Sequence, residues 1–107
     1  MTDCIFCKIV NKEAPADIVY EDEETIVFEN IRPSTPIHLL AVPKKHIASV
    51  DDIQEADGEL IGKVVIAARK AAASKGLDET GYKLAVNVGR GGGQEVFHLH
   101  IHILGGF

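Results

Sequence analysis

The stretch Val96-Phe97-His98-Leu99-His100-Ile101-His102-Ile103-Leu104 places three of the chain's five histidines at every second position, with apolar residues between them. Successive strand residues point to opposite faces and rise by about 3.3 Å, so these imidazoles would share one face about 6.6 Å apart. Imidazole titrates near neutral pH and acts as nucleophile, acid, base or metal ligand. A solvated edge strand would carry mixed polar residues instead. We therefore predict a strand over 96–104 whose histidine face carries the chemistry.

Composition limits the classes of partner. The 107 residues are 46% hydrophobic, which predicts one domain over 1–107 with a single core. The net charge is -5 and no basic run exceeds Lys44-Lys45, so we expect no nucleic-acid partner. The N-terminus lacks the features of a signal peptide, and no apolar stretch approaches the roughly 20 residues of a membrane span. We predict a cytoplasmic protein that does not contact a membrane.

The hydrophobic pattern predicts two helices. Asp3 is expected to cap a short helix that puts Cys4 and Cys7 one turn apart on the same side. Apolar residues at three- and four-residue spacing predict a long helix over 54–75, which Gly76 ends.

Strand patterns occupy the rest of the chain. We expect five strands, over 18–20, 25–28, 37–42, 82–88 and 96–104. One short helix, three strands, one long helix and two strands are typical of an α+β fold with a five-stranded antiparallel sheet.

A glycine-rich turn, Gly89-Arg90-Gly91-Gly92-Gly93-Gln94, leads into the histidine strand. Its glycines let main-chain amides approach an anion without interference from side chains. The turn lacks the Lys-Ser/Thr ending of a P-loop, and a strand follows where a dinucleotide fingerprint needs a helix. Beside three histidines, the turn predicts a cradle for phosphate.

The only two cysteines, Cys4 and Cys7, are spaced as a metal clip or a redox pair rather than as a secretory disulfide framework. A thioredoxin-like motif would need a strand before its helix and a parallel βαβ setting, and the pattern offers neither. Zinc is the favoured interpretation, with two thiols that hold no metal as the alternative.

The segment His98-Leu99-His100-Ile101-His102-Ile103-Leu104 resembles His-φ-His-φ-His-φ-φ, where φ is apolar, the signature of the histidine triad (HIT) family. Cys4-Ile5-Phe6-Cys7-Lys8-Ile9-Val10, Pro43-Lys44-Lys45-His46-Ile47 and Gly92-Gly93-Gln94 look like its Hint branch, the nucleoside phosphoramidases. The resemblance covers essentially the whole chain. It implies a HIT-like fold and hydrolysis of purine nucleoside 5′-phosphoramidates, such as AMP amides, through a nucleotidyl-histidine.

The resemblance also implies catalytic roles. His100 would attack the α-phosphorus, and His102 would bind the phosphate and pass a proton to the leaving group. His98 completes the triad. Glu95 stands where well-studied members carry Ser, so it either favours amines as leaving groups or turns away from the phosphate.

Positions that hold the nucleotide in the family can be carried over. The apolar residues that clasp a purine correspond to Ile5, Phe6, Ile9, Phe28, Ile31 and Leu40. The phosphate side corresponds to Asn87, Gly93, Gln94, Val96, His100 and His102. Asn30 matches the ribose-binding position, where the best-known members have Asp. An amide offers one acceptor and a donor in place of two acceptors, so contacts to ribose should differ.

Related members with paired cysteines hold zinc with a histidine of the Pro-x-x-His turn and the first triad histidine. The resemblance therefore implies a structural zinc on Cys4, Cys7, His46 and His98. His38 is expected to support the triad through a hydrogen bond. The family also implies a homodimer that pairs through the long helix and a strand edge.

Three alternatives to the phosphoramidase remain open. A dinucleoside polyphosphate hydrolase would share the chemistry of His100 and differ in the leaving group. A zinc-stabilised nucleotide-binding or interaction module would show little turnover. A catalytic zinc on the three triad histidines would make activity sensitive to chelators.

Overall fold

The computed structural model describes residues 4–107, so Asp3, the predicted helix cap, lies outside the described residues. The helices are α1 (Ile5–Val10), α2 (Gly58–Ser74) and α3 (Leu77–Thr80), with short 3-10 turns at Val50–Asp52, Glu55–Asp57 and Arg90–Gly92. The strands are β1 (Ile18–Glu21), β2 (Thr25–Glu29), β3 (Ile37–Pro43), β4 (Lys83–Ala85) and β5 (Ile101–Gly105). In this part of the chain no helix has the length and hydropathy that crossing a membrane requires.

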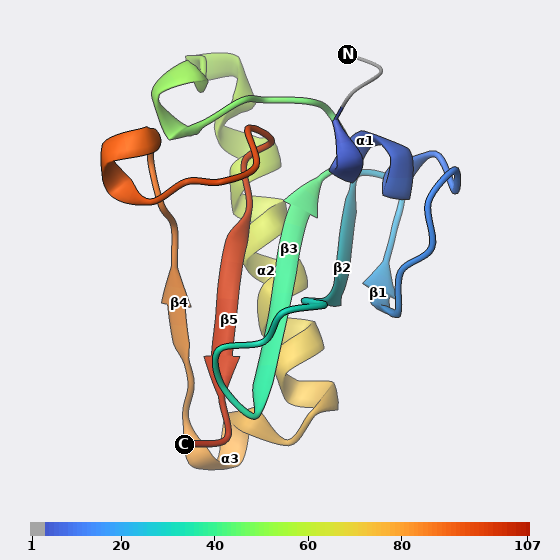
Figure 1. Cartoon of the computed structure of the whole chain (residues 1–107), viewed down its shortest axis with the longest axis vertical. Helices are drawn as coiled ribbons and strands as arrows, with labels where there is room; N and C mark the ends of the chain where they lie inside the picture. The colour runs from blue at the N-terminus through green and yellow to red at the C-terminus, as the bar shows by residue number, and fades with distance from the viewer. Residues whose placement is uncertain (1–3) are drawn as a thin grey trace.

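The five strands form one antiparallel sheet in the order β1-β2-β3-β5-β4, which confirms the predicted α+β class (Figure 1). After β3 the chain leaves the sheet, runs through α2 and α3, and adds β4 at the edge before β5 fills the place beside β3. Leu40 in β3 pairs with His102 in β5, so the histidine segment lies in the middle of the sheet.

Each strand sends alternate side chains to opposite layers. Val27, Leu39 and Ile103 pack with the buried alanines of α2, which lies behind the sheet in Figure 1. Phe28 and Leu40 face the other way and pack against α1. Leu40 and His102 occupy paired positions, so the ring of His102 lies on the α1 side of the sheet.

The last strand is shorter than predicted. β5 begins at Ile101, and residues 96–100 are irregular, so the expectation of one strand over 96–104 was wrong for its first half. The Leu99 amide donates to the Ile47 carbonyl at 2.6 Å, which ties the segment to the loop after β3 instead of to β4. His98 and His100 therefore precede the strand, and His102 alone of the three lies within it.

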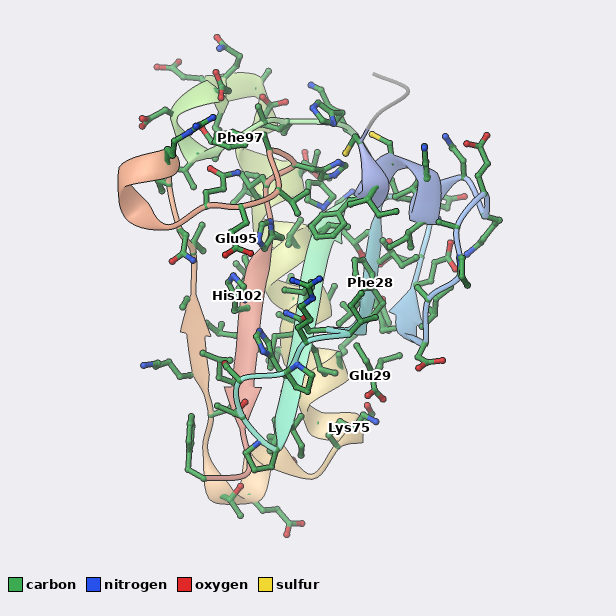
Figure 2. The ribbon with its side chains drawn as sticks, in the orientation of Figure 1. Phe28, Glu29, Lys75, Glu95, Phe97 and His102 are labelled. Atoms are coloured by element: carbon green, nitrogen blue, oxygen red, sulfur yellow. The ribbon has the colours of Figure 1, made fainter. Side chains whose placement is uncertain are left out.

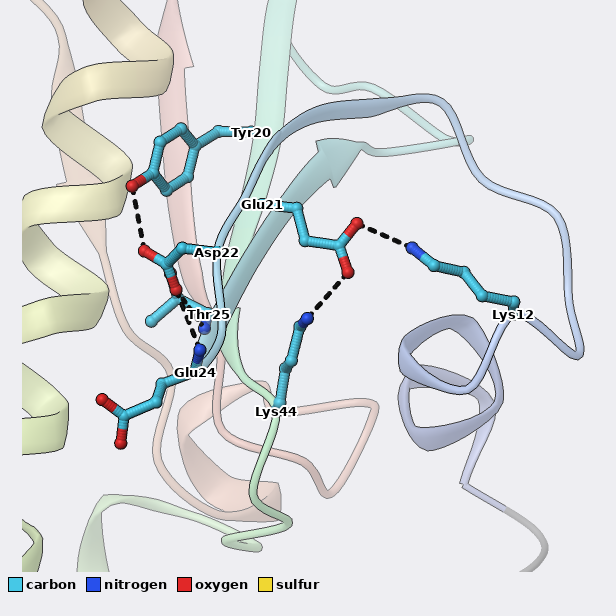
Figure 3. Close-up of polar contacts among 7 residues, drawn as sticks. All are labelled: Lys12, Tyr20, Glu21, Asp22, Glu24, Thr25 and Lys44. Carbon is cyan, nitrogen blue, oxygen red and sulfur yellow. Dashed lines mark hydrogen bonds and ion pairs between the residues drawn. The ribbon is translucent and has the colours of Figure 1, made fainter.

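An ion-pair bridge fastens the loop between α1 and β1 (Figure 3). One carboxylate oxygen of Glu21 accepts from Lys12 and the other pairs with Lys44, each at 2.7 Å. These two ammonium groups, Lys12 first, hold the pKa of Glu21 below its ordinary value. The bridge joins the loop to the start of the segment that carries His46.

Candidate active site and metal centre

A cavity of about 670 Å³ opens on the α1 side of the sheet. Figure 2 labels Phe28, Glu95 and His102, all of which contribute to its walls. The cavity brings together every predicted nucleotide-binding residue except one. Those on its walls are Ile5, Phe6, Ile9, Phe28, Asn30, Ile31, Leu40, Asn87, Gly93, Val96, His100 and His102.

Gln94 is the exception, because its side chain is buried and occupied. Its Nε2 donates to the carbonyls of Ala48 (2.7 Å) and Val96 (3.0 Å), and its Oε1 accepts from the Gly89 amide (2.9 Å). The residue braces the glycine-rich turn against the loop after β3. The structure thus gives Gln94 a supporting place rather than a wall position.

The main-chain amides of the glycine-rich turn also donate to acceptors within the turn. Gly92 and Gln94 donate to the Gly89 carbonyl, and Gly93 donates to the Arg90 carbonyl. These short-range bonds belong to the 3-10 turn, so the predicted phosphate cradle is not formed by these three amides. Within residues 4–107 the Val96 amide has no hydrogen-bond acceptor, which leaves it available on the cavity wall.

His100 has a defined tautomer. Its Nδ1 lies 2.8 Å from the His98 carbonyl oxygen, which can only accept, so Nδ1 carries the proton and donates. Nε2 of the neutral ring therefore keeps its lone pair. The edge-to-face contact with Phe6, with ring centroids 5.2 Å apart, holds the ring in place. Burial lowers the pKa of His100 below its ordinary value, so the ring is an uncharged nucleophile at neutral pH.

A chain of hydrogen bonds fixes the proton on His102. The Ser34 amide donates to Nδ1 of His38 at 3.0 Å, so the proton of neutral His38 is on Nε2. Nε2 of His38 donates in turn to Nδ1 of His102 at 2.9 Å. The remaining proton of His102 is therefore on Nε2, which is buried and has no partner among the described residues. His38 thus has the supporting contact that the sequence predicted.

Asn30 approaches the same group without joining it. Its Oδ1 accepts from the Arg32 amide at 2.8 Å, which fixes the orientation of the side-chain amide. The Nδ2 atom lies 3.3 Å from Nε2 of His38, but both nitrogens carry hydrogens in this arrangement, so the contact is not a hydrogen bond. Asn30 is left with donors to offer to a ligand in the cavity.

The triad is uncharged at neutral pH. Burial is the main cause, and it lowers the pKa of His98 and of His102 to about 4. The hydrogen bond to the Pro43 carbonyl opposes this shift at His98, while the neighbouring His100 and His38 reinforce it at His102. An anion in the cavity would meet the neutral Nε2–H donor of His102 instead of an imidazolium ion.

The four predicted metal ligands, Cys4, Cys7, His46 and His98, converge beside the cavity. Their ligand atoms all lie within 4.8 Å of one another. Nε2 of His98 donates to the Pro43 carbonyl at 2.8 Å, so its Nδ1 lone pair faces the Cys4 and Cys7 sulfurs at 3.4 and 3.6 Å. Nδ1 of His46 lies 3.2 Å from the Cys7 sulfur. Two sulfurs and two imidazole nitrogens form a donor set that fits tetrahedral zinc.

The local fold explains how the cysteines reach this place. Cys4 is the N-cap of α1, and its sulfur accepts from the Cys7 amide at 3.4 Å. One helical turn then brings both sulfurs to the same end of α1. The opposite side of the helix presents Phe6 and Ile9 to the cavity, so α1 serves both sites.

Part of the cavity wall had no signal in the sequence. Ala14, Pro15 and Ala16 line it because the loop after α1 folds back over the sheet, and small residues in a loop carry no periodic pattern. Glu29 and Arg32 also line the cavity. Their neighbours Phe28, Asn30 and Ile31 were the local pointers to this wall.

Comparison with known proteins shows the family of the chain. The family model described as "Scavenger mRNA decapping enzyme C-term binding" matches residues 3–106. Protein HitA of Neisseria gonorrhoeae is 49% identical over 105 residues, which cover 98% of this chain and 97% of that protein. The chain belongs to the histidine triad (HIT) family.

Solved HIT structures share the fold closely. The HIT family hydrolase from Legionella pneumophila Philadelphia 1 is 50% identical, with a TM-score of 0.95 over 98% of this chain and 94% of that chain. A Zn-bound histidine triad family protein from Mycobacterium smegmatis is 36% identical, with a TM-score of 0.81 over 96% of this chain and 74% of that chain. The predicted HIT fold is thus confirmed.

Proposed function

We propose that this HIT protein hydrolyses purine nucleoside 5′-phosphoramidates through a covalent nucleotidyl-His100 intermediate. The observation that carries the proposal is the tautomer of His100, whose Nδ1 proton is held by the His98 carbonyl while Nε2 keeps a lone pair. A neutral imidazole with a lowered pKa is an available nucleophile at pH 7. The description of the Legionella relative as a hydrolase supports the same class of reaction.

In the first step the Nε2 lone pair of His100 forms a bond to the α-phosphorus, and the phosphorus–nitrogen bond to the amine breaks. The anionic phosphate raises the pKa of His102 in the complex, so the hydrogen-bonded pair of His38 and His102 takes up one further proton from solvent with the substrate. The amine nitrogen leaves with the electron pair and takes a proton from Nε2 of His102, which returns the histidine pair to its neutral form. His38 keeps Nδ1 of His102 occupied, so that Nε2 is the atom that exchanges protons.

In the second step water attacks the phosphorus and passes its proton to Nε2 of His102. The bond between phosphorus and Nε2 of His100 breaks, and the electron pair returns to the ring. The products are a nucleoside monophosphate and the starting form of both histidines. Dividing one difficult displacement into two easier ones is the advantage of the covalent route.

The cavity provides a place for each part of the nucleotide. Phe6, Phe28 and Leu40 form an apolar wall for a purine. Asn30 would donate to the ribose hydroxyls, since its oxygen is already occupied by the Arg32 amide. The free amide of Val96 would donate to a phosphate oxygen, in place of the internally bonded amides of the glycine-rich turn.

Zinc would be held by Cys4, Cys7, His46 and His98. Four protein ligands leave no open coordination position, so the metal would stabilise the fold without contacting the substrate. The ring of His98 would be fixed by zinc on one side and by Pro43 on the other. Its carbonyl, which orients His100, is then set by the metal centre.

A homodimer is also part of the proposal. β4 is an edge strand, and Leu84 on it pairs with Ile103, whose side chain faces α2. Leu84 is 40% exposed and Val65 of α2 is 42% exposed, so the edge strand and the helix each present apolar surface. Light scattering after size exclusion should give twice the chain mass, whereas a monomer would contradict the dimer. Cytoplasmic location stays a prediction.

The test is steady-state hydrolysis of adenosine 5′-phosphoramidate by the native protein and by His100→Ala. We expect release of AMP by the native protein, its loss in the variant, and an AMP adduct in the mass of native protein quenched during turnover. Absence of turnover in folded native protein would overturn the phosphoramidase. Cleavage of a dinucleoside polyphosphate in the same assay would then identify the other hydrolase.

A further inference from the structure

The loop before β5 places a carboxylate on the cavity wall beside the triad. Glu95 is exposed and lines the cavity together with His100, His102 and Asn87. Figure 2 shows Glu95 and His102 labelled on the same side of the sheet. Because its neighbour Gln94 is braced by three hydrogen bonds, the backbone that carries Glu95 is held in position.

The charge of Glu95 has no counterion in the described part of the protein. Among the described residues the other carboxylate that lines the cavity is Glu29, which pairs with Lys75 at 3.1 Å (Figure 2). No lysine, arginine or histidine nitrogen within residues 4–107 lies within 4.0 Å of the Glu95 carboxylate. The cavity's one arginine, Arg32, belongs to the loop between β2 and β3, on the Asn30 side.

An anionic phosphate near the triad would therefore meet an uncompensated negative charge. His102 is neutral before substrate binds, so it does not offset the charge of Glu95. Repulsion between the carboxylate and the phosphate would weaken binding unless a positive charge accompanies the substrate. His102 supplies the leaving group's proton in the proposed reaction, so a residue on its wall is well placed to meet the leaving group.

We propose that Glu95 selects phosphoramidates whose leaving amine carries a second, positively charged group. The inference rests on the proposed function and names its substrate class: nucleotide amides of diamines, in which one nitrogen is bound to phosphorus and the other carries the positive charge. The ammonium group would lie between the carboxylate and the phosphate and reduce their repulsion. For partly exposed charges, we expect a preference of about fivefold for a cationic over a neutral leaving group.

The experiment compares three adenosine 5′-phosphoramidates of similar length. Their amines are 1,4-diaminobutane (cationic), pentylamine (neutral) and 4-aminobutyrate (anionic). The kcat/KM ratios are measured in native protein and in Glu95→Gln, and dividing one ratio by the other cancels the intrinsic reactivity of each amide. We expect about a 25-fold range between cationic and anionic amides in the native protein, about fivefold for each charge step. That range should shrink in Glu95→Gln and at high salt.

Glu29→Gln is the matched control, because it removes a cavity carboxylate that Lys75 already compensates. Its ratios should follow those of the native protein. Equal ratios in native protein and Glu95→Gln, with turnover of all three amides, would overturn the role of Glu95 and leave the hydrolase intact.

A second readout separates failure of the inference from failure of the proposed function. Calorimetric binding of the three amides is measured with His100→Ala and with His100→Ala/Glu95→Gln. Tighter binding of the cationic amide that depends on Glu95 would support charge selection even if the native protein turned over none of them. Identical affinities in the two variants would overturn it.

Discussion

The two ends of the histidine segment differ in how many ring nitrogens the protein itself uses. His98 is fully buried, with Nε2 on the Pro43 carbonyl and Nδ1 facing two cysteine sulfurs. His100 and His102 each commit Nδ1 alone, and Nε2 of each has no hydrogen-bond partner among residues 4–107. A histidine whose two ring nitrogens both face protein groups thus has a structural role, whereas a histidine with one free nitrogen can take part in the reaction.

The largest expected effect comes from removing the two kinds of histidine separately. His100→Ala should lower kcat/KM for adenosine phosphoramidate by about 10⁴-fold or more, because it deletes the nucleophile. His98→Ala should also lose zinc and about 3 kcal/mol of stability, since it leaves a buried cavity and breaks the metal centre. Urea unfolding and metal analysis of both variants provide the comparison. Equal losses of stability and metal in the two variants would contradict the division of roles.

The role of the proposed zinc site can be tested without substituting any of the three triad histidines. Cys7→Ser should abolish stoichiometric zinc and lower the free energy of unfolding by about 3 kcal/mol, because a structural metal contributes its binding energy to folding. Activity should fall indirectly, through the His98 carbonyl that orients His100. Lys45→Ala, beside His46 but outside the ligand set, is the control and should retain zinc. A Cys7→Ser protein as stable as native protein in the presence of zinc would refute a structural site.

Much of the fold and of the candidate site could be predicted from the sequence, and some features could not. The alternating strand patterns and the long helix predicted the sheet, and the paired cysteines favoured zinc. The resemblance to the histidine triad family implied the full set of metal ligands and the residues of the cavity walls. The start of β5 at Ile101 was not predictable, because it depends on the Leu99 amide bonding to a loop some fifty residues earlier. The tautomers depend likewise on the Pro43 carbonyl and the Ser34 amide, tertiary contacts that no local pattern encodes.

The end of the histidine segment that carries His100 and His102 also depends on His38, which directs the proton of His102 to Nε2. His38→Leu removes the donor to Nδ1 of His102 and leaves that nitrogen unsatisfied, so kcat/KM should fall by about 10- to 100-fold. His38→Gln can still present an amide donor and should recover part of the loss. Steady-state kinetics of the pair provide the test. If the two variants were equally impaired, donation to His102 would not be the function of this side chain.

The smallest effect is a pH dependence of stability that belongs to His102. Its pKa is about 4 in the folded protein, against 6.5 for an ordinary histidine, so folding favours the neutral ring. The unfolded chain binds more protons between these values, and the contribution of His102 is present above pH 6.5 and is lost as pH falls toward 4. Relative to His102→Gln, native protein should therefore lose about 1 kcal/mol more stability between pH 7 and pH 5.5.

Urea unfolding of native protein and His102→Gln at the two pH values, with saturating zinc, measures this difference. Both proteins contain the metal and His98, so the pH dependence of the metal centre cancels in the comparison. Parallel losses would show that the ring accepts a proton as readily in the fold as in water. The open nitrogen of His102 would then be hydrated rather than held apart from solvent for a substrate. A steeper loss of stability in native protein would show that the fold keeps His102 neutral, with its Nε2–H donor free of a partner among residues 4–107. His98 differs, because its second nitrogen faces the cysteine sulfurs.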